Sequence, residues 1–194
     1  MDMPLDTMSD ESDEVLLVLF ANGDALAARA LTARLTPRVM GHAYRLLGNH
    51  AEAEDVTQEA MLRLWKVAPD WRQGEAKVTT WLYRVVANLC ADLRRRARGV
   101  ALDSIPEPED GRATAAETLQ DTARAEALQS ALDHLPDRQR QAVVLRHIEG
   151  LANPEIAEIM EITTEAVESL TARGKRALTA ALSGRQEELG YGDE

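Results

Sequence analysis

The stretch from Trp71 to Gly99 combines the side chains that a nucleic-acid surface needs. It holds two of the chain's three tryptophans, one of its three tyrosines and seven cationic side chains against two carboxylates, a local net charge of +5. Cations hold phosphate groups and aromatic rings stack on unpaired bases, so this stretch is typical of a surface that binds unpaired nucleic acid. The alternative is that the tryptophans are core residues and the arginines form a solvated face, and composition alone favours neither.

A helix that starts near Thr80 would position these side chains, because its apolar residues recur at helical spacing. One narrow stripe carries the residues expected to be buried, which are Leu82, Val85, Val86, Leu89 and Leu93. The opposite side carries Arg84, Asn88, Ala91 and Arg95, flanked by Tyr83 and Arg94. A polar loop with Gly74 and Lys77 precedes this helix, and Gly99 is expected as its C-cap.

The charge of the whole chain limits how this basic stretch can be used. The chain of 194 residues has a net charge of −11, so everything outside residues 71–99 sums to −16. A strongly acidic protein does not coat nucleic acid nonspecifically, because phosphate repels it. One basic stretch in an acidic chain predicts a DNA contact that is weak alone and needs a carrier protein.

The sequence predicts a cytoplasmic protein without membrane insertion. The longest apolar run, Val15 to Ala21, is too short to span a bilayer and follows an acidic N-terminus, the reverse of a signal peptide. The single cysteine, Cys90, cannot form an internal disulfide, which fits a reducing compartment.

The periodicity of the apolar residues predicts an all-α fold, because no run alternates with period two. Helices are expected over residues 13–21 and 24–47, the second ended by Gly48. Asn49 is the expected N-cap of a third helix, AEAEDVTQEAMLRLWK, with Glu52 completing a capping-box pattern. The apolar face of this helix carries Ala53, Val56, Ala60 and Leu64, and the opposite face carries Asp55, Gln58, Glu59, Leu62 and Lys66.

That mixed face, with carboxylates, an amide and an exposed leucine, resembles a protein–protein patch more than a plain solvated surface. Paired carboxylates are also compatible with acid–base catalysis. No nucleophile, histidine pair or phosphate-binding glycine loop accompanies them, so the sequence does not support an enzyme.

Composition predicts two helical domains joined by a flexible linker. Residues 1–12 form an acidic tail, 13–99 a first domain, 100–117 a linker with prolines and glycine, 118–184 a second domain and 185–194 an acidic tail.

The second domain carries a helix-turn-helix pattern. A short helix opened by Asn153 and a first-turn proline runs to Met160, and Thr163 caps a longer helix that ends near Leu182. The second helix would present polar side chains to a major groove, namely Thr164, Glu165, Glu168, Ser169, Ala172, Arg173 and Arg176.

Together these pieces resemble a small sigma factor of bacterial RNA polymerase, of the extracytoplasmic-function (ECF) type. The third helix looks like the polymerase-binding helix of the family, with its DxxQE core at Asp55, Gln58 and Glu59. WRQGEAKVTTWLYRVVANLCADLRRR resembles the segment that melts promoters and reads the minus-10 element. LPDRQRQAVVLRHIEGLANPEIAEIMEITTEAVESLTARGKRAL resembles the minus-35-reading domain. The resemblance covers about residues 13–183, in the order and spacing of the family.

The resemblance implies a role for particular residues. Those implied for polymerase binding are Asp55, Gln58, Glu59, Leu62 and Arg63. Those implied for minus-10 DNA are Arg72, Lys77, Trp81, Tyr83, Arg84, Asn88, Arg94, Arg95 and Arg96. Those implied for minus-35 DNA are Thr164, Ser169, Arg173, Lys175 and Arg176. No catalytic residue, metal or cofactor is implied.

The partners implied by the resemblance are core RNA polymerase, through its beta-prime clamp and beta flap, promoter DNA and an anti-sigma factor. The expected function is initiation at the promoters of a stress or signal regulon, without an obligate homo-oligomer. A flipped base of the melted strand would enter a pocket beneath residues 71–79.

The chain departs from the family's pattern in the minus-35 domain. Glu161 stands where the turn often has glycine, so the turn must avoid a positive φ or strain this residue. Glu168 and Leu170 stand where the family commonly has lysine and arginine, and Thr171 replaces a usual leucine. Readout here is expected to depend on DNA shape with few direct base contacts.

Two other classes of protein remain as alternatives. An ordinary helix-turn-helix regulator would need a dimer and a palindromic site, and leaves Asp55 to Glu59 unexplained. A structural adaptor that binds only proteins leaves the basic stretch unexplained. An enzyme has no support, since the four histidines have no metal-ligand spacing.

Overall fold

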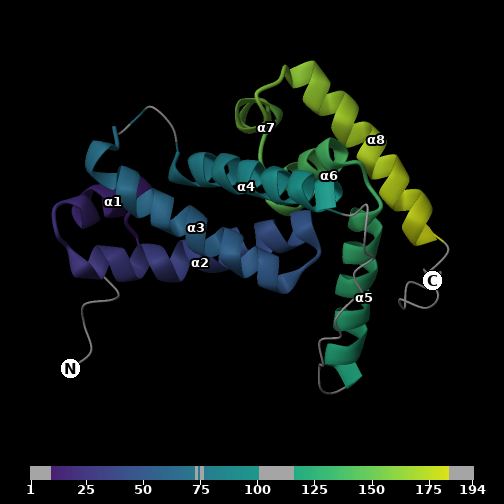
Figure 1. The fold of residues 1–194 in the computed structure, drawn as a ribbon, viewed down its shortest axis with the longest axis horizontal. Helices are drawn as coiled ribbons and strands as arrows, with labels where there is room; N and C mark the ends of the chain where they lie inside the picture. Colours follow the sequence, from purple (N-terminus) through teal and green to yellow (C-terminus); the bar gives the residue numbers. More distant parts are fainter. Residues whose placement is uncertain (1–9, 73, 75–76, 101–115, 184–194) are drawn as a thin grey trace. The chain divides into compact units, whose positions relative to one another are not determined.

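The computed structural model describes residues 10–72, 74, 77–100 and 116–183 (Figure 1). Within these ranges every regular element is a helix, which confirms the all-α fold. The chain divides into two compact units, Met1–Cys90 and Ala91–Glu194, and the division falls inside helix α4. The two-domain architecture is confirmed. The predicted bounds stay predictions, because the linker and both tails lie mostly outside the described ranges.

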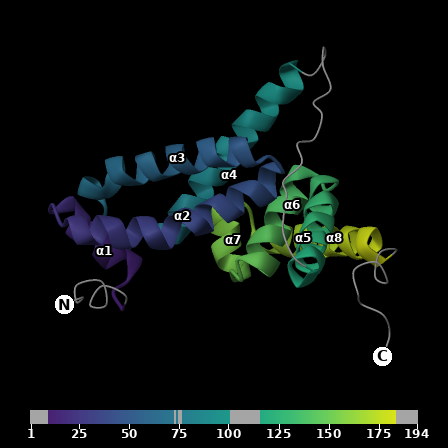
Figure 2. The same ribbon diagram turned by 90° about the horizontal axis from the view of Figure 1, so that it is seen from below.

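The first unit contains α1 (Asp13–Ala21), α2 (Ala25–Leu47), α3 (His50–Val67), the 3-10 helix η2 (Ala68–Asp70) and the start of α4 (Val78–Val100). Helices α2 and α3 pack side by side, as Figure 2 shows, and α1 packs on α2. Their shared core is made of leucines and valines, including Leu16, Leu17, Leu31, Leu35, Val39, Leu64, Leu82 and Val86. This core holds the polar face of α3 and the start of α4 in place.

Local capping explains most helix boundaries in this unit. Asp24 accepts backbone hydrogen bonds at the start of α2, and Asn49 accepts the N–H of Glu52 at the start of α3, as predicted. Gly48 ends α2 with a positive φ of 73°, a conformation that glycine adopts without a Cβ penalty.

Helix α4 differs from the sequence prediction at both ends. It begins at Val78, two residues before the predicted start, because the carboxylate of Glu14 accepts the Val78 N–H at 3.0 Å. It also continues through Gly99 to Val100, so the prediction of Gly99 as a C-cap is wrong. The helix lacks a local stop signal at this point, and one glycine costs it only about 1 kcal/mol.

The second unit contains the rest of α4, α5 (Ala116–Asp133), α6 (Asp137–Val143), a π-helical turn η3 (Val144–Ile148), α7 (Asn153–Met160) and α8 (Thr164–Ser183). Its buried apolar residues include Leu132, Val143, Leu145, Ile156 and Val167. The buried Arg140 joins α5 to α6 by donating to the backbone oxygens of Asp133 and Leu135. These hydrogen bonds tie α6 to the end of α5, and α8 of the helix-turn-helix packs on α6.

Helices α7 and α8 form the predicted helix-turn-helix. Helix α7 starts at Asn153, so Ala152 and not Asn153 occupies the N-cap position, and Glu155 accepts the Ala152 N–H at 3.0 Å. Glu161 ends α7 with φ 53° and ψ 51°, the left-handed conformation. The sequence predicted that this turn must avoid a positive φ or strain the glutamate, and the structure has the strained form. Thr163 then caps α8 through its hydroxyl, as predicted.

Within the described ranges, no helix is both long enough and apolar enough to cross a membrane.

Candidate functional sites

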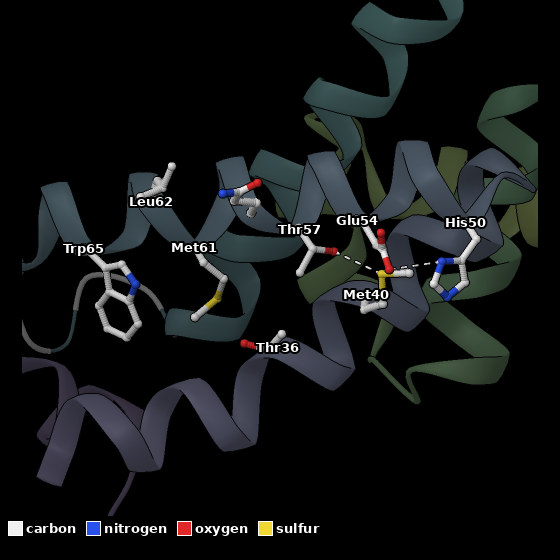
Figure 3. Close-up of a pocket in the computed structure, with 9 residues that line it drawn as sticks. Thr36, Met40, His50, Glu54, Thr57, Met61, Leu62 and Trp65 are labelled. Atoms are coloured by element: carbon white, nitrogen blue, oxygen red, sulfur yellow. Dashed lines mark hydrogen bonds and ion pairs between the residues drawn. The ribbon is translucent and has the colours of Figure 1, made fainter.

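A groove of about 500 Å³ lies in the first unit between α2 and α3 (Figure 3). Two methionines, a leucine and a tryptophan supply its apolar part, and hydroxyl, amide, imidazole and carboxylate groups supply its polar part. The lining residues are Thr36, Met40, His50, Glu54, Thr57, Gln58, Met61, Leu62 and Trp65. Thioether and aromatic side chains in an open groove suit an apolar protein segment better than a phosphate or a sugar.

Interactions inside the first unit hold the groove in shape. The Thr57 hydroxyl donates to the Met40 sulfur at 3.6 Å, and the His50 ring lies 3.3 Å from the Glu54 carboxylate. In Figure 3, Trp65 and Met61 point from α3 toward α2. The Trp65 ring also packs against Phe20 of α1, with ring centroids 4.6 Å apart. This contact holds the tryptophan in place at its end of the groove.

The residues predicted to bind polymerase lie on α3, the helix that forms one side of this groove. Asp55, Gln58, Leu62 and Arg63 are exposed, and Glu59 is half-buried and accepts a hydrogen bond from Arg63 at 2.7 Å. Gln58 and Leu62 line the groove itself. Leu62 is 46% exposed, and among the described residues no other large apolar side chain is exposed to solvent.

The sequence did not predict the groove, although it did predict the face of α3. Thr36 and Met40 come from α2 and meet α3 only after the two helices pack. The two methionines were the available signal for a groove, because flexible thioether side chains are common at adaptable binding surfaces. Met40 lies on α2 and Met61 on α3.

The predicted minus-10 residues fall into an exposed group and a partly covered group. Arg72, Lys77 and Asn88 are exposed, whereas Trp81 and Arg84 are half-buried. Trp81 meets Trp71 edge to face, with ring centroids 6.1 Å apart and planes at 87°. The tryptophans therefore pack on each other, and Arg72 follows Trp71 directly in the sequence.

Tyr83 does not lie where the sequence placed it. It was expected to flank the exposed side of α4, but it is only 4% exposed and its ring packs on the buried His42 with centroids 4.6 Å apart. The helical wheel assumed one narrow buried stripe, whereas His42 of α2 also packs on Tyr83 beside that stripe. Tyr83 is therefore a core residue of this unit, and the prediction that it flanks the exposed side of α4 is wrong. Its role toward minus-10 DNA stays a prediction.

The remaining minus-10 candidates lie farther along α4. Arg95 and Arg96 are exposed, and Arg95 forms an ion pair of 3.1 Å with Asp92 one turn earlier. Arg94 is half-buried and pairs with Asp137, and both residues belong to the second unit. A pair exposed to solvent, such as that of Arg95, is worth little and yields readily to a phosphate.

The predicted minus-35 residues lie along α8. Arg173, Lys175 and Arg176 are exposed, while Thr164 and Ser169 are half-buried. The Ser169 hydroxyl accepts a hydrogen bond from Arg173 at 2.5 Å, so these two residues present one polar group. The cations lie in the middle of α8, and none of the described residues of its first turn is basic.

Two acidic residues occupy the first half of α8. A hydrogen bond from its own backbone N–H and one from the Thr163 hydroxyl lower the pKa of Glu165, which therefore belongs to the cap of the helix. Glu168 is exposed, and its carboxylate accepts a hydrogen bond from the side chain of Asn153 at 3.4 Å. Ionised carboxylates only accept hydrogen bonds and repel phosphate. We therefore expect neither residue to bind the phosphate backbone of DNA.

No group of three or more metal-ligating side chains occurs among the described residues.

Two family models match this chain. The model of Sigma-70 region 2 matches residues 31–100, and the model of Sigma-70, region 4 matches residues 125–178. The first match contains the groove and the basic surface of α4, and the second contains the helix-turn-helix. The matches follow each other in the chain and leave residues 101–124 between them.

Two curated relatives match across most of their length. The chain is 34% identical over 179 residues to the ECF RNA polymerase sigma factor SigE of Mycolicibacterium smegmatis, which covers 88% of this chain and 68% of the relative. It is 33% identical over 150 residues to the ECF RNA polymerase sigma factor SigW of Bacillus subtilis, which covers 72% of this chain and 80% of the relative.

Solved structures with a similar fold include CnrH in complex with the cytosolic domain of CnrY. That match has a TM-score of 0.65 and 26% identity, and covers 90% of this chain and 99% of CnrH. The sigma factor RpoE of Bartonella quintana, solved with the anti-sigma factor NepR, has a TM-score of 0.64 and 23% identity, covers 78% of this chain and 94% of RpoE, and supports the fold.

Proposed function

Because this chain belongs to the ECF sigma factors of bacterial RNA polymerase, we propose that it carries core polymerase to the promoters of one stress or signal regulon. The observation that carries the proposal is the presence of both family regions in one chain, in order, with a basic surface on the first and a helix-turn-helix in the second. The protein supplies no bond-making chemistry of its own, and it acts in the cytoplasm, where polymerase and DNA meet.

Docking on polymerase uses the exposed face of α3 and the groove beside it. Asp55, Gln58 and Arg63 supply polar contacts at the rim, and Leu62 supplies an apolar anchor. An exposed leucine beside an apolar groove loses water-exposed surface when a partner covers it, which favours association. The beta-prime clamp of the polymerase is the expected partner for this face, and the beta flap is the expected partner for the second unit.

Promoter melting uses the segment 71–77 and the exposed side of α4. Arg72 and Lys77 would hold phosphates of the separated strand, and Asn88 and Arg84 would contact its bases. The Trp71–Trp81 pair gives this surface an aromatic floor. Base flipping costs a few kcal/mol of unstacking, which such aromatic and polar contacts offset.

Minus-35 binding uses α8, with Arg173, Lys175 and Arg176 as its phosphate contacts. Because acidic residues occupy the first half of α8, we expect little affinity from that half and a readout that depends on DNA shape. The acidic chain then binds DNA firmly only when polymerase presents both units to one promoter.

An anti-sigma factor is the expected regulator, as the family resemblance implies. CnrH, which has this fold and 26% identity, was solved with a second protein bound to it. The groove and the exposed Leu62 offer an apolar surface that such a partner could cover. A regulator that covers the polymerase-binding face would silence the protein by competition.

Run-off transcription tests the proposal. Purified core polymerase is assayed with and without this protein on pooled genomic promoter fragments, and discrete new transcripts are expected, which also identify the promoter sequence. Binding to polymerase without new transcripts would favour an inhibitor or adaptor. Absence of polymerase binding would remove the proposal.

A matched pair of variants tests the docking face. The double variant Asp55→Ala with Gln58→Ala is expected to weaken polymerase binding about tenfold or more while the melting temperature stays unchanged. Glu126→Ala removes an exposed carboxylate on α5 and is the control, expected to bind normally. Equal binding by all three proteins would exclude this face of α3.

A further inference from the structure

The N-terminus of α4 needs a hydrogen-bond acceptor, and among the described residues one comes from a distant part of the chain. The first N–H groups of a helix have no partner inside the helix and are usually satisfied by a side chain just before it. Lys77 occupies that position, and an ammonium group only donates. The first turn of α4 contains no acidic residue either.

Glu14 of α1 supplies this acceptor. Its Oε1 accepts the Val78 N–H at 3.0 Å, although the two residues are 64 positions apart in the sequence. Burial alone would raise the pKa of Glu14, but the hydrogen bond from Val78, further hydrogen bonds from its own N–H and Ser12, and the charge of Lys77 together lower it. The carboxylate is thus ionised at neutral pH and faces both the end of the loop and the start of the helix.

Helix α1 also contacts the chain at the other end of the loop. It packs against η2, which ends at Asp70, directly before the loop. Its Phe20 packs on Trp65 at the end of α3. Figure 1 shows α1 at the end of the first unit where α3 finishes and α4 begins. The residues on either side of the segment 71–77, namely η2 and Val78, therefore contact the same short helix.

Helix α1 is itself firmly attached. Leu16 and Leu17 are completely buried, and Asp13 accepts a hydrogen bond from Arg34 of α2 at 2.8 Å. A helix of nine residues is not stable alone, so its order comes from these contacts. A rigid support at both ends of a loop reduces the conformations that the loop can take before it binds.

We propose that α1 is the support of the DNA-melting surface and that Glu14 is a positioning residue for promoter opening. The proposal rests on the proposed function, because promoter opening is the step it concerns. Glu14 touches no DNA in this scheme. The Glu14 carboxylate fixes the direction in which α4 starts and attracts the ammonium group of Lys77. Arg72, Lys77 and the tryptophan pair would then meet the separated DNA strand in one arrangement.

Hydrogen exchange of the Val78 amide tests the contact without any transcription assay. In the full-length protein, Glu14→Ala is expected to lower protection of this amide about fivefold, since a lost cap costs about 1 kcal/mol. Glu14→Gln keeps an oxygen acceptor and is expected to retain most of the protection. Unchanged protection in Glu14→Ala would overturn the proposed contact.

Promoter opening tests the role. Polymerase bound to each variant is assayed for strand separation with a fluorescent base in the minus-10 element, and polymerase affinity is measured in parallel. Glu14→Ala is expected to open the promoter about tenfold more slowly with unchanged polymerase affinity, and Glu14→Gln to stay within about threefold of the wild type. Glu11→Gln is the matched control, since Glu11 is an exposed acid whose backbone oxygen, not its side chain, contacts Arg34.

The outcomes separate this proposal from the proposed function. If wild-type protein opens promoters and Glu14→Ala opens them equally fast, the positioning role is excluded and the proposed function stands. If Glu14→Ala loses polymerase affinity and opening together, Glu14 only stabilises the fold and the positioning role is again excluded. If the wild type opens no promoter while the Val78 amide still depends on Glu14, the contact stands and the proposed function fails.

Discussion

Glu161 sits in a backbone conformation that its side chain does not favour. Its φ of 53° lies in the left-handed region, where a Cβ costs about 1 kcal/mol relative to glycine. We expect Glu161→Gly to raise the free energy of unfolding by about 0.5–1 kcal/mol, measured by urea denaturation. Glu158→Gly, in the interior of the same helix, is the control and should lower it by about 1 kcal/mol. Destabilisation by both changes would mean that the Glu161 side chain makes a contact worth more than the strain.

Gly174 is required where α8 approaches α6. A Cβ at this position would lie 2.5 Å from Cγ2 of Val143 and 3.2 Å from the backbone oxygen of Gln139. Gly174→Ala is therefore expected to lower the free energy of unfolding by about 1–3 kcal/mol, despite the better helix propensity of alanine. Gly41→Ala in α2 meets no atom within 4 Å and should stabilise by about 1 kcal/mol. Thermal denaturation of both variants checks the pair, and a stable Gly174→Ala would show that the two helices can separate at little cost.

At the scale of elements, the junction of α1 and α4 should respond to acid. The pKa of Glu14 is lowered below its ordinary value of 4.5, so this carboxylate stabilises the fold above that pH. The contribution is lost as the pH falls through the lowered folded-state pKa, because the unfolded chain then binds the proton more readily. The stability difference between wild type and Glu14→Gln should accordingly shrink from pH 6 to pH 3 in denaturant titrations. A constant difference over this range would exclude an ionised cap.

The acidic first half of α8 makes a second prediction for an element. Glu168 adds a negative charge to a helix that is expected to lie on DNA, and it is exposed. Glu168→Lys should tighten binding of the polymerase complex to promoters. It should also add about one phosphate contact, which steepens the plot of log affinity against log salt concentration by about 0.9. Glu126→Lys on α5 makes the same charge change away from α8 and is the control. An equal response from both variants would mean that net charge matters and the position on α8 does not.

Local signals predicted most of the helices, and long-range packing decided where the prediction failed. Asn49 and Thr163 cap their helices through contacts three residues away, which a sequence displays directly. The start of α4 depends on Glu14, which lies 64 residues earlier, and no local pattern contains that information. Tyr83 is buried for the same reason, since His42 of α2 covers a side of α4 that the wheel left open. The groove beside α3 likewise exists only once α2 supplies Met40.

At the scale of the whole molecule, charge explains why two DNA-binding regions belong to a protein that needs polymerase. The chain has a net charge of −11, and ten of its 22 lysines and arginines lie in residues 71–99 and the middle of α8. Each region alone offers few phosphate contacts, so each binds weakly at physiological salt. Two weak contacts become strong when a carrier holds both near one duplex, because the second then binds at high effective concentration.

This reasoning predicts how the free protein and its polymerase complex differ. Without polymerase, we expect a promoter duplex to be bound no more tightly than about 10⁻⁶ M at physiological salt, which is the range of nonspecific contacts. With core polymerase the same duplex should be bound specifically, about 10³-fold or more tightly than unrelated DNA. Fluorescence anisotropy with promoter and scrambled duplexes measures both affinities. Tight and specific binding by the free protein would contradict the role of polymerase as carrier and would favour an independent helix-turn-helix regulator, whose dimer should then be visible in sedimentation.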